Sequence, residues 1–130
     1  MRQSEILITS VLGVVRSDIR PMAYTLDVII DLLFIRKIPK GDIRITLHVY
    51  PIVANLLDKS PAAISRSVQR VANLCWDAAY RQDRMMELFG RTLYDVPSTC
   101  DILFYFAFLL YFRAPFFSIL DDLCDLDSPA

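Results

Sequence analysis

Residues 60–79 of the chain read SPAAISRSVQRVANLCWDAA. Ser60 and Pro61 predict the start of a helix, because serine is a favoured N-cap residue and proline fits the first helical turn. The apolar residues that follow recur at the spacing of a helix side that faces a core, namely Ile64, Val68, Val71, Ala72 and Cys75. The stretch therefore predicts one long amphipathic helix that ends near Ala79 or Tyr80.

The opposite side of this helix is polar, and its first carboxylate is Asp77. An arginine guanidinium can bond both acceptors on a guanine edge, and a glutamine amide can pair with adenine. A helix N-terminus and a serine hydroxyl can donate hydrogen bonds to a phosphate. The pattern predicts contacts with double-stranded DNA at Lys59, Ser60, Ser65, Arg66, Gln69, Arg70 and Asn73.

The residues before Ser60 predict a short helix from Pro51 to about Leu57, followed by a tight turn at Asp58 and Lys59. A short helix, a tight turn and a longer amphipathic helix follow one another in a helix-turn-helix, whose second helix enters the major groove. A helix with two outward arginines that is simply solvated has the same pattern, so both interpretations stay open. Trp76 and Tyr80 are predicted to lie in the core.

The rest of the chain also favours helices over strands. Only 3 of the 130 residues are glycine, and apolar residues recur at helical rather than alternating spacing. Ser4 and Asp42 are candidate N-caps, and Ser98 with Asp101 resembles a capping box. Further helices are predicted over about 4–12, 22–36, 43–49, 84–89 and 98–113, with a loop at 37–42 and an apolar turn at 116–120. We expect an all-α, compact bundle of about six helices in a single domain, residues 1–130.

Acidic residues are concentrated at the C-terminus. The net charge is -1, but residues 121–130 contain four aspartates, so that residues 1–118 hold 14 basic and 11 acidic side chains. This mildly basic balance permits DNA binding without proving it. We interpret 121–130 as a solubilising acidic tail, or one that competes with DNA. The cluster of Arg36, Lys37, Lys40 and Arg44 is either a set of phosphate contacts or a solvated loop.

The cysteines and the single histidine give no sign of a metal site or of catalysis. Cys75, Cys100 and Cys124 form no CxxC pair, and no secretory leader is recognisable, which predicts free, buried thiols in the cytoplasm. His48 is the only histidine, and we interpret it as structural. No Ser-His-Asp set, phosphate-binding loop or zinc-ligand spacing is visible, so we expect no enzyme activity, cofactor, metal or small-molecule substrate.

Residues 102–112, ILFYFAFLLYF, form an apolar run. A membrane-spanning helix needs about 20 residues, and Arg113 and Pro115 interrupt this one. The first interpretation is a buried core helix. The second is an interface between two copies of the chain, because a helix that is apolar all round exceeds what one small domain usually covers. Membrane insertion is a remote third.

These residues resemble the DNA-binding effector domain of the sporulation master response regulator of endospore-forming bacteria, the stage-zero sporulation protein A family. The resemblance runs from about Leu12 to the last long helix. It rests on the order and spacing of Leu12-Gly13-Val14, Tyr24, Ile45-Thr46, Tyr50-Pro51, Ala54, Arg66, Trp76, Phe89-Gly90, Thr92 and Pro97. It implies a bacterial transcription regulator of about six helices that binds promoter DNA, with the helix at 61–79 in the major groove.

The chain departs from this family at the positions that read bases. Arg66 matches, but Ala63 and Ser65 stand where the family has an arginine and a glutamate, and Gln69 and Arg70 stand where it has an arginine and a histidine. Losing a bidentate base contact removes about 1–3 kcal/mol of discrimination. We therefore expect a different DNA sequence preference. The alternative is a degenerate member that acts as a protein-interaction or dimerisation module. The family's receiver domain has no counterpart here.

Overall fold

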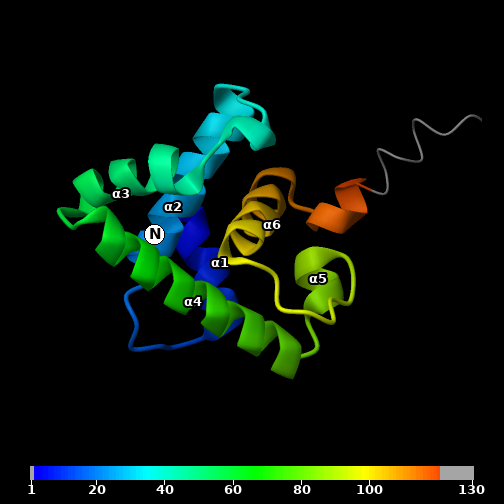
Figure 1. The fold of residues 1–130 in the computed structure, drawn as a ribbon. Helices are drawn as coiled ribbons and strands as arrows, with labels where there is room; N and C mark the ends of the chain where they lie inside the picture. The colour runs from blue at the N-terminus through cyan, green and yellow to red at the C-terminus, as the bar shows by residue number, and fades with distance from the viewer. Residues whose placement is uncertain (1, 121–130) are drawn as a thin grey trace, which may run out of the picture.

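Residues 2–120 are described by a computed structural model, and all of their regular secondary structure is helical (Figure 1). The predicted all-α class is therefore confirmed, and the acidic tail lies outside the described residues. The labelled α-helices are α1 (Gln3–Leu12), α2 (Arg20–Ile30), α3 (Tyr50–Leu57), α4 (Pro61–Arg81), α5 (Met85–Phe89) and α6 (Thr99–Phe112). Residues 116–120, predicted as an apolar turn, are also helical. Between α2 and α3 lie two π-helical segments, η1 (Asp31–Ile35) and η3 (Ile45–Val49), and a 3-10 turn, η2 (Lys40–Asp42).

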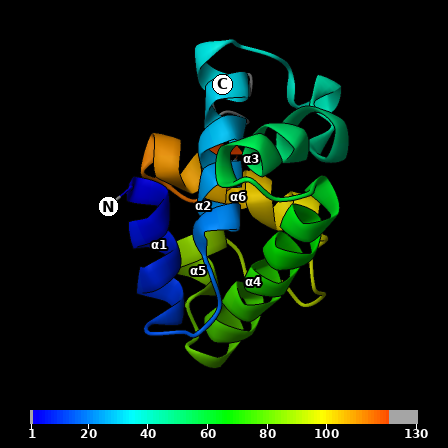
Figure 2. The same cartoon turned by 90° about the vertical axis from the view of Figure 1, so that its left-hand side faces the viewer.

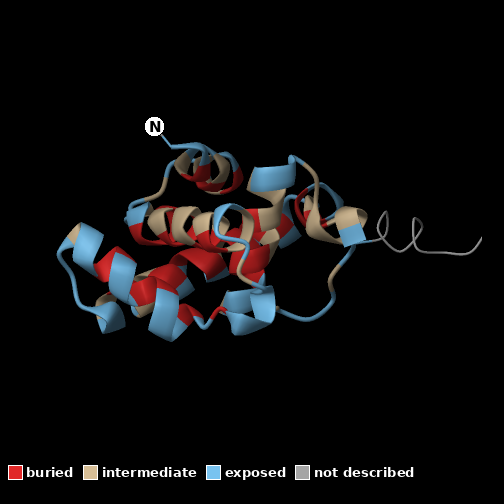
Figure 3. Cartoon of the chain, turned by 90° about the horizontal axis from the view of Figure 1, so that it is seen from above, coloured by how far each residue is buried: buried red, intermediate tan, exposed pale blue. Residues whose placement is uncertain are grey.

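Helix α2 runs through the middle of the bundle and contacts α1, α3, α4 and α6 (Figure 2). Met22, Leu26 and Ile29 on α2 are fully buried. Figure 3 shows the buried residues gathered between the helices and the exposed residues on their outer sides. Burying such a side chain contributes about 1.5–3 kcal/mol. The buried apolar residues of all the longer helices form a single core cluster.

The apolar run on α6 is mostly a core helix, as first interpreted. Ile102, Leu103 and Phe106 are fully buried. The last turn reaches the surface, where Tyr111 stacks on Phe34 of η1 with ring centroids 4.0 Å apart. Among the residues that the structure describes, no helix is long and apolar enough to cross a membrane.

The predicted N-cap at Ser4 is wrong. Helix α1 begins at Gln3, and Ser4 lies within it, 1% exposed. Its hydroxyl has no hydrogen-bond partner within residues 2–120. A serine close to a helix start predicts a cap only where its backbone lies just outside the helix.

The predicted separate helix over 43–49, capped by Asp42, is replaced by a different connection. Asp42 ends the 3-10 turn η2, and η3 then continues directly into α3. Tyr50 N–H bonds the Ile45 carbonyl five residues earlier, and the Arg44 N–H donates to Nδ1 of His48 at 2.9 Å. Pro51 has no N–H to donate, so it fits the first turn of α3. The predicted helix over 22–36 likewise ends as a π-helical segment, η1.

Candidate nucleic-acid interface

The start of α4 is formed by the residues that the sequence indicates. The Ser60 hydroxyl accepts a hydrogen bond from the Ala63 N–H at 3.1 Å, which makes Ser60 the N-cap. Before it, Asp58 adopts the left-handed conformation with φ 55°, and the Lys59 N–H bonds the Ala54 carbonyl at 2.9 Å. This closes α3 and turns the chain sharply into α4. The predicted tight turn at Asp58 and Lys59 is confirmed.

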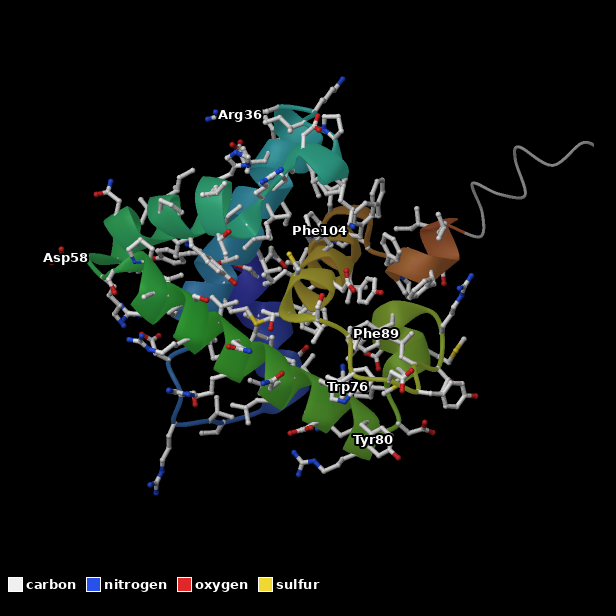
Figure 4. The ribbon with its side chains drawn as sticks, in the orientation of Figure 1. Arg36, Asp58, Trp76, Tyr80, Phe89 and Phe104 are labelled. Carbon is white, nitrogen blue, oxygen red and sulfur yellow. The ribbon has the colours of Figure 1, made fainter. Side chains whose placement is uncertain are left out.

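Helix α4 is amphipathic in the predicted orientation. All five residues of the predicted inner side, Ile64, Val68, Val71, Ala72 and Cys75, are fully buried. On the outer side Arg66, Gln69, Arg70 and Asn73 are exposed, and Ser65 is half-buried. In Figure 4, Asp58 marks the turn that precedes α4, and Tyr80 lies in its last turn. The helix is 21 residues long, which corresponds to about 30 Å.

Arg66 and Arg70 differ from most arginines of the bundle. Within residues 2–120 neither guanidinium has a hydrogen bond or an ion pair. Four other arginines are held by carboxylates: Arg2 by Asp27, Arg20 by Asp18, Arg36 by Asp31 and Arg84 by Glu87. Arg66 and Arg70 are therefore available to an anionic partner without breaking a described contact, whereas Arg81, the third arginine of α4, hydrogen-bonds the Asp77 carbonyl at 3.3 Å.

Lys59 has a carboxylate beside it that the sequence does not reveal. Its Nζ lies 3.7 Å from Oδ2 of Asp18, in the loop between α1 and α2. The Arg20 guanidinium hydrogen-bonds the same carboxylate at 2.8 Å. This hydrogen bond, with a smaller contribution from the charge of Lys59, lowers the pKa of Asp18 to about 2. A phosphate that contacts Lys59 must therefore compete with Asp18.

Ser65 and Gln69 lie on one flank of α4, against two other segments. They line a surface hollow of about 310 Å³ together with Ile45, Thr46 and Tyr50 on one side and Ser98, Thr99 and Cys100 on the other. The predicted DNA-contacting residues are thus divided between the outer side of α4 and this hollow. Tyr50 and the start of α6 are additional candidates, and no local sequence signal points to them.

Of the two aromatic residues predicted to lie in the core from the C-terminal half of α4, only one is buried. Trp76 is buried, with its ring 6.2 Å from that of Phe89 on α5, but Tyr80 is 68% exposed. Tyr80 lies on the outer side because it follows Arg66 by 14 residues, almost four full turns. Tyr80, Tyr94 and Val96 border a second hollow of about 450 Å³.

The basic cluster at 36–44 is not one free positive patch. The Arg36 Nε lies 3.0 Å from Oδ2 of Asp31. The Lys40 ammonium lies over the Phe104 ring on α6, 4.6 Å from its centroid. Two of its four cations are therefore already engaged with neighbouring groups.

The cysteines differ in environment. Cys75 is buried, and burial raises the pKa of its thiol to about 12. Cys100 is exposed, contrary to the predicted buried thiols, and Cys124 lies outside the described residues. In the described part of the chain no group of three His, Cys, Asp or Glu side chains could hold a metal ion.

The chain was compared with protein-family models, curated proteins and solved structures, and none of these comparisons gave a match. The resemblance to the sporulation regulator's DNA-binding domain therefore remains a prediction.

Proposed function

We propose that this protein is a transcription regulator that binds duplex DNA, with the first half of α4 in the major groove. The observation that carries this proposal is the pair Arg66 and Arg70, exposed on one helix without a partner within residues 2–120. The major groove admits an α-helix, and arginine is the side chain that most often makes base-specific contacts there. Asp77, the first carboxylate of α4, lies two turns beyond Gln69.

In this proposal α3 and α4 form the helix-turn-helix. Arg66 and Gln69 contact base edges, and Arg70 and Asn73 contact the groove edge. The start of α4 faces a phosphate, with Ser60 and Lys59 as its side-chain contacts. The proposal is supported by the tight turn at Asp58, which joins the two helices through only three residues outside them.

The test is binding of fluorescent duplexes selected from a random library, measured by anisotropy for the native chain and for Arg66→Ala and Arg70→Ala. Arg66→Ala is expected to weaken binding by about tenfold or more, since a good base contact contributes about 1–3 kcal/mol. Arg70→Ala, which removes a positive charge at the groove edge, is expected to weaken binding about equally for all sequences. Thermal unfolding should stay unchanged, because both side chains are exposed. Arg81→Ala is the matched control: an exposed arginine on the same helix, 11 residues beyond Arg70. Unchanged affinity in both variants would contradict the proposal.

A second candidate function is supported by apolar side chains at the surface. Tyr111 and Phe112, in the last turn of α6, are 46% and 44% exposed, and Leu120 is 40% exposed. Pairing of two copies through these residues would make the protein an interaction module that does not bind DNA. Light scattering at high protein concentration separates the two functions. A dimer whose affinity barely changes with salt concentration, in a protein that does not bind the duplex library, favours the interaction module. A strict monomer contradicts it.

A further inference from the structure

The hollow beside α4 brings together three segments that are distant in the sequence. Its lining comes from the η3–α3 junction, from the flank of α4 and from the first turn of α6. Ser98 caps α6, and its hydroxyl accepts the Asp101 N–H at 3.1 Å. The N–H groups of Thr99 and Cys100 precede the first intrahelical bond of α6, so they are available donors at the positive end of a 14-residue helix.

Tyr50 is the second observation that points to a ligand. This residue is only 6% exposed, it lines the hollow, and its hydroxyl has no hydrogen bond to any residue of the described chain. Burial raises the pKa of Tyr50 to about 12, so the phenol keeps its proton at neutral pH. Ser4 Oγ is the one fully buried, unpartnered side-chain polar atom of residues 2–120, so the Tyr50 hydroxyl is accessible from solvent although the ring is buried. A protonated phenol in this position can donate to an anion in the hollow.

Two charged side chains, Lys40 and Asp101, act on Cys100 at the edge of the hollow. Lys40 lies over the ring of Phe104, and Phe104 follows Cys100 by one turn of α6. The pKa of the Cys100 thiol is raised, chiefly because the thiol is partly buried. The charge of Asp101, which is exposed in the first turn, raises this pKa further, and the positive charge of Lys40 acts in the opposite direction with a smaller effect. Lys40 therefore favours an anion near Cys100, and the nearer charge of Asp101 opposes it more strongly, so the donors that hold an anion here are the backbone N–H groups and the Tyr50 hydroxyl.

We propose that this hollow binds one phosphate group, held by the Thr99 and Cys100 N–H groups and the Tyr50 hydroxyl, with Lys40 supplying positive charge. This inference rests on the proposed function in one respect only: because Ser65 and Gln69 of α4 line the same hollow, the phosphate is a backbone phosphodiester beside the groove that α4 enters. A free phosphate ion has the same chemistry, and the experiment separates the two sources.

The first measurement is affinity for a random duplex pool. Tyr50→Phe and Lys40→Gln should each weaken binding about three- to tenfold, equally for all sequences, and Lys40→Gln should reduce the salt slope by about one. Asp101→Asn should strengthen binding. Two matched controls should leave affinity near that of the native chain: Tyr105→Phe, which removes a tyrosine hydroxyl outside the hollow, and Arg81→Ala, which removes a positive charge from the far end of α4.

The second measurement locates the ligand through Cys100, which lines the hollow. In a Cys124→Ser background, the rate at which iodoacetamide alkylates Cys100 is followed by mass spectrometry, with inorganic phosphate or with duplex DNA present. Occupancy should slow the reaction, and Tyr50→Phe should remove most of this protection. Unfolding curves of each variant confirm that the fold is kept.

The outcomes separate this inference from the proposed function. Weaker duplex binding in Tyr50→Phe and Lys40→Gln, with Cys100 protected by duplex, supports a backbone phosphate in the hollow. Protection by inorganic phosphate without duplex binding supports the phosphate site and contradicts the DNA proposal. Duplex binding that depends on Arg66 but not on Tyr50 or Lys40, with Cys100 unprotected, overturns the phosphate site alone. Absence of protection by either probe overturns it as well.

Discussion

Gly90 ends α5 in the left-handed conformation, with φ 85°. A Cβ at this position would lie 2.8 Å from the backbone nitrogen of Ser118. The position therefore excludes a side chain for two reasons, the backbone conformation and the close approach of the segment after α6. The sequence predicts the first reason, since glycine often follows a helix end, but not the second.

Gly90→Ala is expected to destabilise the protein by about 2 kcal/mol or more, since the left-handed conformation alone costs about 1–2 kcal/mol. For a domain of this size that lowers the melting temperature by several degrees. Calorimetry or denaturant unfolding measures the change. Gly41→Ala is the control, because a Cβ there meets nothing within 4 Å; an equal loss in both variants would contradict this account of Gly90.

Some single-residue predictions from the sequence are confirmed by the structure and others are wrong. Ser60 and Ser98 were predicted as N-caps and are N-caps, because the signal for a cap is local. Ser4 and Tyr80 were placed wrongly. A serine close to a helix start resembles a cap whether it lies inside or outside the helix. An aromatic residue near a helix end is buried only if another element covers it.

At the scale of the elements, the turn between α3 and α4 is connected to the loop between α1 and α2. Asp18 accepts hydrogen bonds from Arg20 and lies beside Lys59. Because the pKa of Asp18 is lowered to about 2, its contribution to stability is present above the ordinary aspartate pKa, about 3.9. That contribution is lost as the pH falls through the folded-state value. The pair is exposed, so its contribution is small, below about 1 kcal/mol.

Asp18→Asn is expected to have two effects. The variant should lose less stability than the native chain between pH 4 and pH 2, as measured by urea unfolding at each pH. At pH 7 it should bind duplex DNA more tightly, because the carboxylate no longer competes with a phosphate for Lys59. Asp27→Asn, which removes a carboxylate paired with Arg2, is the control for the change in net charge. Weaker DNA binding by Asp18→Asn would contradict a phosphate contact at Lys59.

The order of helices could be predicted better than their junctions. Helix α4 has a cap, a first-turn proline and a regular apolar side, so its start and its buried residues were both predicted. The segment from Lys40 to Tyr50 has no comparable signal. Its 3-10 turn and its π-helical hydrogen bonds depend on backbone pairing that a single-sequence pattern does not contain.

At the scale of the whole molecule, the sequence predicted the fold class and one side of the candidate site. The outer side of α4 belongs to one helix, so the period of 3.6 residues was enough to find Arg66, Gln69 and Arg70. The hollow joins residues 45–50, 65–69 and 98–100, and no local pattern connects them. The same holds for Asp18 beside Lys59. Contacts between distant segments had to come from the structure.

Trp76 is the only tryptophan in the sequence, and it is buried on α4 next to Phe89 of α5. Its indole emission therefore reports the packing of these two helices with no label attached. Emission from a buried indole is blue-shifted and protected from iodide, and both properties disappear when α4 separates from α5. The helix proposed to enter the groove thus contains its own optical probe of whether it remains folded in each variant.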